Sequence, residues 1–289
     1  MKDFSGKIAV VTGGGSGIGR ALVQALTSEG CSVAMCDIRE ADMLETVRIA
    51  EKTAVQGVKI TTFVADVAQE KETLAFRDHT GEQHETDHVH LLFNNAGIGG
   101  GGSFVNTPRD QWERTFAVCW YGVYYNARAF LPMLLKAPEA HMINVSSVNG
   151  FWASLGPQTS HTAYSAAKFA VKGFTEALVN DFRNNAPHVK ASVVMPGHIG
   201  TNIAINSILA YAPAERQQEE IKAYAEAFRD NGLPPAEAAK IILDGVREER
   251  WRILVGPDAV ALDKAVRAHP EEAYEHGMAD LVAQARAAG

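Results

Sequence analysis

Short apolar runs alternate with longer helical patterns along most of the chain, and this alternation limits the possible folds more than any other feature. The apolar runs lie at residues 7–11, 32–36, 60–64, 90–93, 142–145, 191–195 and 252–255. The helical patterns lie at residues 18–29, 39–56, 69–80, 107–136, 163–183 and 234–249, and the pattern at 107–136 is broken near Cys119. Strands that alternate with helices are typical of a parallel sheet with crossover helices on both faces. We therefore predict an α/β fold: a doubly wound parallel sheet in three layers.

The sequence shows no internal repeat and no low-complexity linker that would divide the chain. We predict a single domain over residues 1–256, followed by a helical extension over residues 257–289. Residues 202–230 form a further helical pattern with no strand to anchor it, and we expect this segment to act as a mobile lid. The extension would either contact a neighbouring subunit or cover the active site.

Charge, hydropathy and cysteine usage exclude several classes of protein. The formal net charge of −7 disfavours a nucleic-acid-binding protein, which needs a basic face. No apolar stretch approaches the roughly 18 residues that a membrane helix needs, and Met1 is not followed by a recognisable signal peptide. Cys31, Cys36 and Cys119 form no C-x-x-C pair, which favours a reducing compartment. We predict a cytoplasmic protein that binds neither nucleic acid nor membrane.

A group of histidines lies among acidic residues between positions 78 and 90. Its members are His79, His84, His88 and His90. Their spacing matches no zinc-binding pattern, and a solvated connection explains them better. We predict no metal site.

A glycine-rich loop joins the first predicted strand to the first predicted helix, at residues 12–19. Glycine permits positive φ angles and lets the backbone approach a ligand closely. The start of the following helix offers free N–H groups to a pyrophosphate. Such a loop alone would suit a tight turn equally well, but its place between a strand and a helix favours dinucleotide binding on a Rossmann-type domain.

Asp37 ends the second predicted strand, where a carboxylate accepts hydrogen bonds from the adenosine ribose and repels a 2′-phosphate. This position favours NAD over NADP. The same aspartate would also serve as an N-cap for the helix that follows. Arg39, two residues further on, keeps NADP open as the alternative cofactor.

Six motifs in order across residues 7–202 make the chain similar to the short-chain dehydrogenase/reductase family. They are Thr12–Gly19 (T-G-x-x-x-G-x-G), Asp66-Val67, Asn94–Gly97 (N-N-A-G), Asn144–Ser147, Tyr164–Lys168 (Y-x-x-x-K) and Pro196–Thr201. The resemblance implies a single Rossmann-type domain, an NAD(P)-dependent reaction at a CH–OH group, and a family-type active site.

The resemblance also implies a role for individual residues. Gly13, Ser16, Gly17 and Ile18 would hold the pyrophosphate, Asp66 and Val67 the adenine, Asn95 its ribose, and Pro196, Ile199 and Thr201 the nicotinamide. Ser147, Tyr164 and Lys168 would carry the chemistry, and Tyr164 and Lys168 would also contact the cofactor.

Tyr164 and Lys168 are four residues apart, so on a helix they share a face. A nearby cation commonly lowers the pKa of an acid by ~1–3 units, which would bring a tyrosine with a reference pKa of about 10 towards a useful range. Ser147 would hydrogen-bond the substrate oxygen. Taken alone, this spacing would more often mark a surface pair, but Ser147 and the glycine loop favour the catalytic interpretation.

The sequence departs from the family in two places. Cys119 stands where many members have an asparagine that helps to hold a proton-relay water, although the backbone carbonyl there would still bind one. The segment between Ser147 and Tyr164 is a few residues longer than usual. It would line a pocket or form a surface loop.

The predicted reaction is therefore the interconversion of a secondary alcohol and a ketone with NAD. A carbonyl reductase using NADPH and a nucleotide-binding regulatory protein on the same fold are the alternatives. A bulky, mainly apolar or aromatic substrate is expected from the apolar residues of three flanking segments: Phe104, Phe151, Trp152, Ile203, Ile205, Ile208, Leu209 and Tyr211.

We also expect a homodimer or homotetramer. Two predicted helices carry more aromatic bulk than one core face needs: Tyr124, Tyr125, Phe130, Phe169, Phe174 and Phe182.

Overall fold

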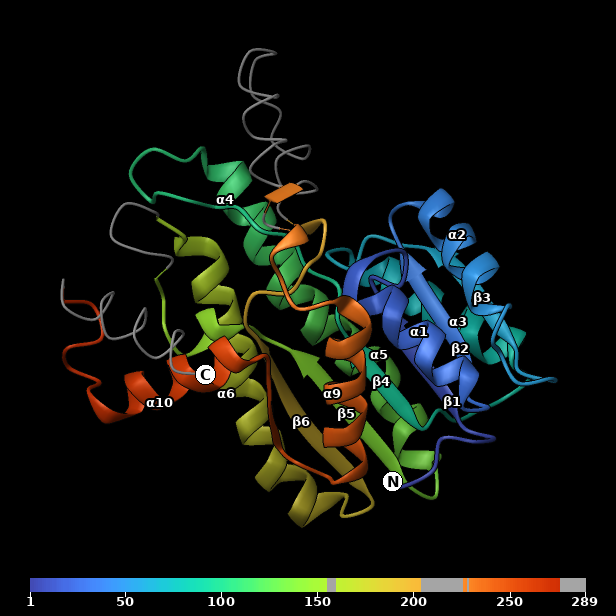
Figure 1. Cartoon of the computed structure of the whole chain (residues 1–289). Helices are drawn as coiled ribbons and strands as arrows, with labels where there is room; N and C mark the ends of the chain where they lie inside the picture. The colour runs from blue at the N-terminus through green and yellow to red at the C-terminus, as the bar shows by residue number, and fades with distance from the viewer. Residues whose placement is uncertain (155–159, 204–225, 228, 276–289) are drawn as a thin grey trace.

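The computed structural model describes residues 1–154, 160–203, 226–227 and 229–275 (Figure 1). Seven parallel strands form one sheet in the order β3-β2-β1-β4-β5-β6-β7. The strands are β1 (Ile8–Thr12), β2 (Ser32–Asp37), β3 (Ile60–Val64), β4 (Leu91–Asn94), β5 (Ala140–Val145), β6 (Val189–Pro196) and β7 (Arg252–Val255). The sheet and its winding confirm the predicted fold class, and each predicted strand lies within two residues of an observed one.

Helices cover both faces of the sheet (Figure 1). They are α1 (Gly17–Ser28), α2 (Glu40–Ala50), α3 (Glu70–Gln83), α4 (Arg109–Phe116), α5 (Gly122–Lys136), α6 (Thr162–Asn185), α9 (Pro235–Arg247) and α10 (Pro257–Ala268). A π-helix, η1 (Ala117–Tyr121), joins α4 to α5, and a 3₁₀ turn, η2 (Val148–Gly150), follows β5. One core lies between the sheet and α1, α2 and α9, and a second lies between the sheet and α3, α5 and α6.

The central strands are apolar because both of their faces are covered. Val10 of β1 pairs with Ala34 of β2 on one side and with Leu92 of β4 on the other, and all three side chains are buried. Continuous apolar runs of this kind are typical of strands in a parallel sheet. The order of the strands reverses between β1 and β4, so the loops that follow these two strands diverge and leave a crevice for a ligand.

Two predicted helices end earlier than the sequence pattern suggested. The helix expected over residues 39–56 ends at Ala50, before the β-branched residues Thr53 and Val55. In the helical extension expected over residues 257–289, α10 ends at Ala268, and residues 276–289 lie outside the described residues. Pro270 explains this second end, because proline disfavours a helical conformation at the residue before it and cannot donate the next backbone hydrogen bond. The expected lid over residues 202–230 lies mostly outside the described residues.

The C-terminal segment packs against the chain that follows β5. Trp152 is buried in a small cluster with Leu262 of α10 and Ala273. Its indole N–H donates to the Ala273 carbonyl at 2.7 Å, and the Ala153 N–H donates to the Tyr274 hydroxyl at 3.0 Å. The expectation that Trp152 lines a substrate pocket is therefore wrong, because this tryptophan anchors the C-terminal segment instead.

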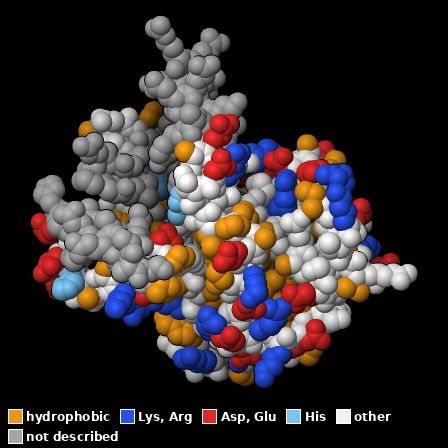
Figure 2. Space-filling view, in the orientation of Figure 1, with side chains coloured by type: hydrophobic (Ala, Val, Ile, Leu, Met, Phe, Trp, Pro, Cys, Tyr) orange, Lys and Arg blue, Asp and Glu red, His pale blue; other side chains and the backbone are white. Residues whose placement is uncertain are grey.

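In the described part of the chain, no helix is both long and apolar enough to cross a bilayer. Acidic and basic side chains are interspersed on the face shown in Figure 2. This mixture fits the modest net negative charge.

The Trp152 cluster yields a stability prediction. Trp152→Ala should lower the free energy of unfolding by about 3–5 kcal/mol, since it leaves a cavity and an unpaired Ala273 carbonyl. Tyr274→Phe is the matched control: it removes one hydrogen bond at a largely exposed ring and should cost about 1 kcal/mol or less. Urea titrations of both variants measure the difference, and equal midpoints would contradict the anchoring role of Trp152.

Candidate functional site

The glycine loop after β1 has a shape that only glycine allows at two of its positions. Gly13 adopts a φ of +68°, in the left-handed region. A Cβ on Gly19 would lie 2.0 Å from the Gly13 carbonyl oxygen, so a larger residue there would displace the loop. The loop thereby presents its backbone at the start of α1, which suits a diphosphate group.

The loop after β4 is joined to the glycine loop through Thr12 and Asn95. The Thr12 hydroxyl oxygen accepts from the Asn95 and Ala96 N–H groups, both at 3.0 Å. The Asn95 side-chain amide donates to the Thr12 carbonyl at 2.9 Å. Asn95 thus reaches the glycine loop from the opposite side of the crevice and holds the two loops together.

Asp37 lies beside the glycine loop with its carboxylate held by backbone donors. Its oxygens accept from the Gly15 N–H at 3.1 Å and from the Arg39 N–H at 3.2 Å. The Arg39 side chain forms an ion pair with Asp42 at 2.5 Å. The Asp37 carboxylate is therefore held in place beside the glycine loop, and the Arg39 side chain pairs with Asp42.

Asp66 and Val67 follow β3, the strand at one edge of the sheet. Asp66 forms an ion pair with Arg114 of α4 at 2.7 Å and accepts from the Ala68 N–H. Val67 is buried against Gly122, whose absent Cβ would lie 2.7 Å from it. Arg114 carried no motif signal, because its contact with Asp66 spans distant parts of the sequence.

Ser147, Tyr164 and Lys168 come together at the end of β5 and the start of α6. The Tyr164 hydroxyl hydrogen-bonds the Ser147 side chain. Lys168 lies one helical turn after Tyr164, with its Nζ 5.4 Å from the tyrosine ring centroid, and it donates to the Val145 carbonyl at 2.9 Å. All three side chains are largely buried. The structure thus brings the three expected catalytic residues into one group.

Burial dominates the protonation of this group. Loss of water raises the pKa of Tyr164 well above its usual value, Cys119 adds to the rise, and the Ser147 hydrogen bond opposes it. Burial also lowers the pKa of Lys168. The pKa of Tyr164 is therefore raised and not lowered as expected, because burial outweighs the effect of the neighbouring Lys168.

Cys119 lies in the π-helix η1, next to the catalytic group. Its thiol is buried and donates to the Ile98 carbonyl at 3.2 Å. A π-helical turn widens the backbone hydrogen-bond pattern and often marks a functional site. The interruption expected near Cys119 is therefore an extra-wide turn within a continuous helical stretch.

The segment Pro196–Thr201 after β6 is held by α10. The Asp258 carboxylate accepts from the His198 N–H at 2.7 Å. A Cβ on Gly197 would lie 2.2 Å from the same carboxylate, so glycine is required at that position. The Thr201 side chain lies against Gly17 of the glycine loop. Asp258 thus positions the backbone of this motif segment, a contact that the motifs alone did not indicate.

The histidines proposed as a solvated group have structural contacts. His90 accepts from the Ile8 N–H at 3.1 Å, His84 hydrogen-bonds Thr61 at 2.9 Å, and His88 lies 3.2 Å from Asp87. Burial lowers the pKa of both His84 and His90 to about 4.

Comparisons with known proteins agree with this geometry. A family model described as short chain dehydrogenase matches residues 7–211. SadH of Mycobacterium tuberculosis, named as an oxidoreductase, is 37% identical over 270 residues, which are 92% of each chain.

Two solved structures have the same fold. A short-chain dehydrogenase/reductase from Burkholderia phymatum, in complex with NAD, is 31% identical with a TM-score of 0.81, and the match covers 94% of this chain and 96% of that one. A short-chain dehydrogenase from Novosphingobium aromaticivorans has a TM-score of 0.73 over 99% of each chain. At 24% identity, this second likeness shows the fold alone.

Proposed function

The chain belongs to the short-chain dehydrogenase/reductase family and is an oxidoreductase, and from this premise we propose that it interconverts a secondary alcohol and a ketone with NAD. The observation that supports the reaction best is the buried group of Ser147, Tyr164 and Lys168 beside the crevice. A phenol that holds a proton at this place provides general acid–base catalysis at a carbonyl oxygen.

Each member of the group has a chemical task. When bound, the nicotinamide ring accepts or supplies the hydride. Tyr164 donates its hydroxyl proton to the carbonyl oxygen during reduction and takes the proton back during oxidation. Ser147 hydrogen-bonds the same oxygen and fixes its distance from Tyr164. Lys168 places a positive charge next to the phenolate that forms when the proton leaves.

The crevice fits NAD at several points. Glycine at positions 13 and 19 keeps the loop in this shape, because a Cβ there would meet Ala96 and the Gly13 carbonyl. Ser16, Gly17 and Ile18 at the start of α1 would bind the diphosphate, and Pro196, Ile199 and Thr201 would border the nicotinamide. Asp66 and Val67 would border the adenine. The related Burkholderia structure contains NAD, which supports this assignment.

The choice of NAD over NADP rests on Asp37. Its carboxylate is held in place by two backbone N–H groups, so it cannot easily turn away from a 2′-phosphate. Arg39, which would otherwise neutralise that phosphate, pairs with Asp42. Two negative groups at short distance repel each other.

We propose a bulky and mainly apolar substrate. Phe104 projects from the loop after β4, where it is largely exposed and packs edge-on against Trp112. Among the described residues that line the cavity beside the start of α6, none is an arginine or lysine that would hold a carboxylate or phosphate. Trp152 does not support this proposal, because it packs against the C-terminal segment. Four other residues expected in the pocket lie outside the described residues: Ile205, Ile208, Leu209 and Tyr211.

We also propose that the protein is a homodimer or homotetramer and works in the cytoplasm. Of the six aromatic residues expected at an interface, Phe130 and Phe182 pack inward and Phe169 lines the cavity beside α6, whereas Tyr124 is 37% exposed and lies one helical turn after Tyr121, which is 42% exposed. Exposed aromatic rings on neighbouring elements are typical of an interface. The three cysteines are buried and unpaired, which supports a reducing compartment.

Removal of the Tyr164 hydroxyl tests the mechanism. Tyr164→Phe keeps the ring but removes the proton donor, so kcat should fall by at least ~10²-fold while the affinity for NAD changes little. The assay follows NADH at 340 nm with a panel of secondary alcohols. Tyr124→Phe, which alters an exposed ring outside the site, is the control. A Tyr164→Phe enzyme with most of its activity would disprove the role of Tyr164.

Removal of one charge tests the cofactor assignment. Calorimetry should show that the wild-type protein binds NAD at least ~10-fold more tightly than NADP, a difference of about 1.4 kcal/mol. Asp37→Asn keeps the size of the side chain and should remove most of this preference. Asp110→Asn on the exposed surface should leave it unchanged. Equal wild-type affinities for the two cofactors would point instead to Arg39 as a phosphate ligand.

The mass in solution tests the oligomer. Light scattering at micromolar concentration should give at least twice the 31.2 kDa of one chain. The double variant Tyr121→Lys with Tyr124→Lys places two charges in the exposed aromatic surface. The measured mass should shift towards that of one chain, because burying these charges on association costs free energy. Val260→Lys on exposed α10 is the control. A single 31.2 kDa species in the wild type contradicts the proposal.

A further inference from the structure

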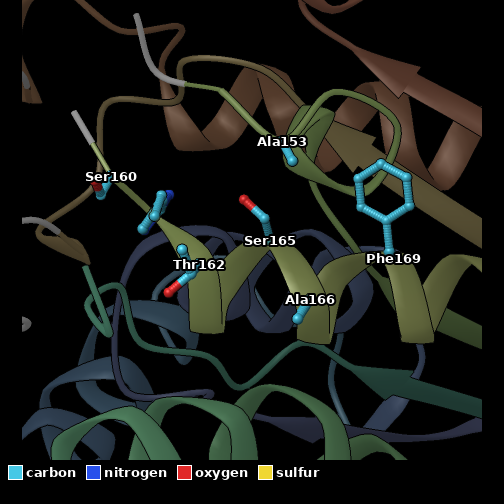
Figure 3. A pocket seen from close by; sticks show the side chains of 7 residues that line it. Ala153, Ser160, Thr162, Ser165, Ala166 and Phe169 are labelled. Carbon is cyan, nitrogen blue, oxygen red and sulfur yellow. The ribbon is translucent and has the colours of Figure 1, made fainter. Parts of the chain in front are cut away.

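A cavity of about 580 Å³ opens beside the N-terminal turns of α6 (Figure 3). Its lining combines polar side chains with a few apolar ones: Ala153, Ser160, His161, Thr162, Ser165, Ala166 and Phe169. Most of these residues belong to the first two turns of α6 or directly precede it. The cavity is therefore shaped by the same helix that positions the catalytic tyrosine.

His161 connects this cavity to the reactive phenol. Its imidazole ring lies parallel to the Tyr164 ring, with centroids 4.5 Å apart and an interplanar angle of 11°. Burial lowers the pKa of His161 to about 4, so the ring is neutral at ordinary pH. A neutral imidazole has one N–H donor and one acceptor nitrogen. The buried Nδ1 atom has no hydrogen-bond partner in the described structure.

Ser165 supplies a second buried polar atom that is available for a hydrogen bond. The residue is only 4% exposed, and its buried Oγ has no hydrogen-bond partner in the described structure. Serine within a helix usually bonds to the carbonyl one turn earlier, whereas here the His161 carbonyl accepts only the Ser165 N–H. In Figure 3 the Ser165 hydroxyl points from α6 towards the space below Ala153.

Thr162 shows by contrast how a hydroxyl in this cavity is normally satisfied. Its Oγ1 accepts from the Trp112 indole N–H at 3.0 Å and lies 2.8 Å from the Gly102 carbonyl, to which it donates. Thr162 therefore fastens α6 to the loop after β4. His161 and Ser165 have no such structural task, although they are one helical turn apart and line the same cavity.

Two buried polar atoms without partners destabilise the protein, unless a ligand supplies the missing hydrogen bonds. We propose that His161 and Ser165 form a polar subsite that binds a second uncharged oxygen of the substrate, close to the carbon that reacts at Tyr164. This inference rests on the proposed function and narrows its substrate class to hydroxyketones, diketones and the corresponding diols on an otherwise apolar skeleton. A carboxylate or phosphate fits less well, because no described lining residue is cationic.

The subsite is tested with two ketones that differ only in the second oxygen, acetophenone and 2-hydroxyacetophenone. The measured quantity is the ratio of kcat/KM for the hydroxyketone to that for the plain ketone, in the NADH-dependent reduction. His161→Phe keeps a flat ring against Tyr164 but removes both nitrogens, and Ser165→Ala removes the hydroxyl. Each change should lower the ratio by about 10-fold, in line with the loss of one hydrogen bond, while kcat/KM for acetophenone stays within about twofold.

A control variant and a second readout keep the result unambiguous. His269→Phe, on the exposed surface after α10, should leave the ratio unchanged. Calorimetry of the two ketones with NADH-loaded Tyr164→Phe protein measures binding without turnover, and adding His161→Phe should weaken only the hydroxyketone.

The possible outcomes separate the subsite from the reaction. If His161→Phe lowers the rate equally for both ketones, His161 only supports the Tyr164 ring, and the subsite proposal is wrong while the proposed function stands. If neither assay shows a preference for the hydroxyketone in protein with His161 and Ser165 intact, the subsite proposal is likewise overturned. Binding of the hydroxyketone without reduction of either ketone would instead support the subsite and contradict the proposed reaction.

Discussion

The hydrogen bonds between the ends of β1 and β4 are the constraint on which the site depends. The Thr12 hydroxyl accepts hydrogen bonds from two backbone N–H groups of the loop after β4, and the Asn95 side chain donates a hydrogen bond to the Thr12 carbonyl. The winding of the sheet reverses between these strands, so the two loops that follow them border the crevice at this point. The glycine loop can therefore stay free of large side chains without losing its position.

A series of buried hydrogen bonds likewise holds Ser147, Tyr164 and Lys168 in position. Asn94 of β4 donates to Asn144 of β5 at 2.8 Å, and Asn144 donates to Thr175 of α6 at 2.9 Å. Ser146 donates to the Lys168 carbonyl at 2.7 Å, and the Lys168 ammonium donates to Val145. These bonds set the position of α6 along β5, because a shift by one residue would leave several buried polar groups unpaired. Tyr164 consequently meets Ser147 at a defined distance.

Local patterns in the sequence predicted the sheet, and the resemblance to the family indicated Ser147, Tyr164 and Lys168 as candidate catalytic residues. Tyr164 and Lys168 are one helical turn apart, and each strand is a short apolar run. Contacts between distant segments could not be predicted in this way: Trp152 with Ala273, Asp258 with His198, and Arg114 with Asp66. The upward shift of the Tyr164 pKa could not be predicted for the same reason. Sequence spacing indicates a neighbouring charge but not the burial that outweighs its effect. Pro270, however, was a readable signal for the end of α10.

These long-range contacts give the C-terminal segment a part in the site. Asp258 at the start of α10 accepts a hydrogen bond from the His198 N–H, and His198 lies between Pro196 and Ile199, which would border the nicotinamide. Near the other end of the segment, Ala273 and Tyr274 hold Trp152 and Ala153, just beyond Ser147. The two loops on either side of the reacting centre are thus fastened to one short element, and Arg252 of β7 pairs with Asp263 in its middle. A change that loosens α10 would move both loops together. We therefore expect it to lower turnover more than a change that loosens only one of the two loops.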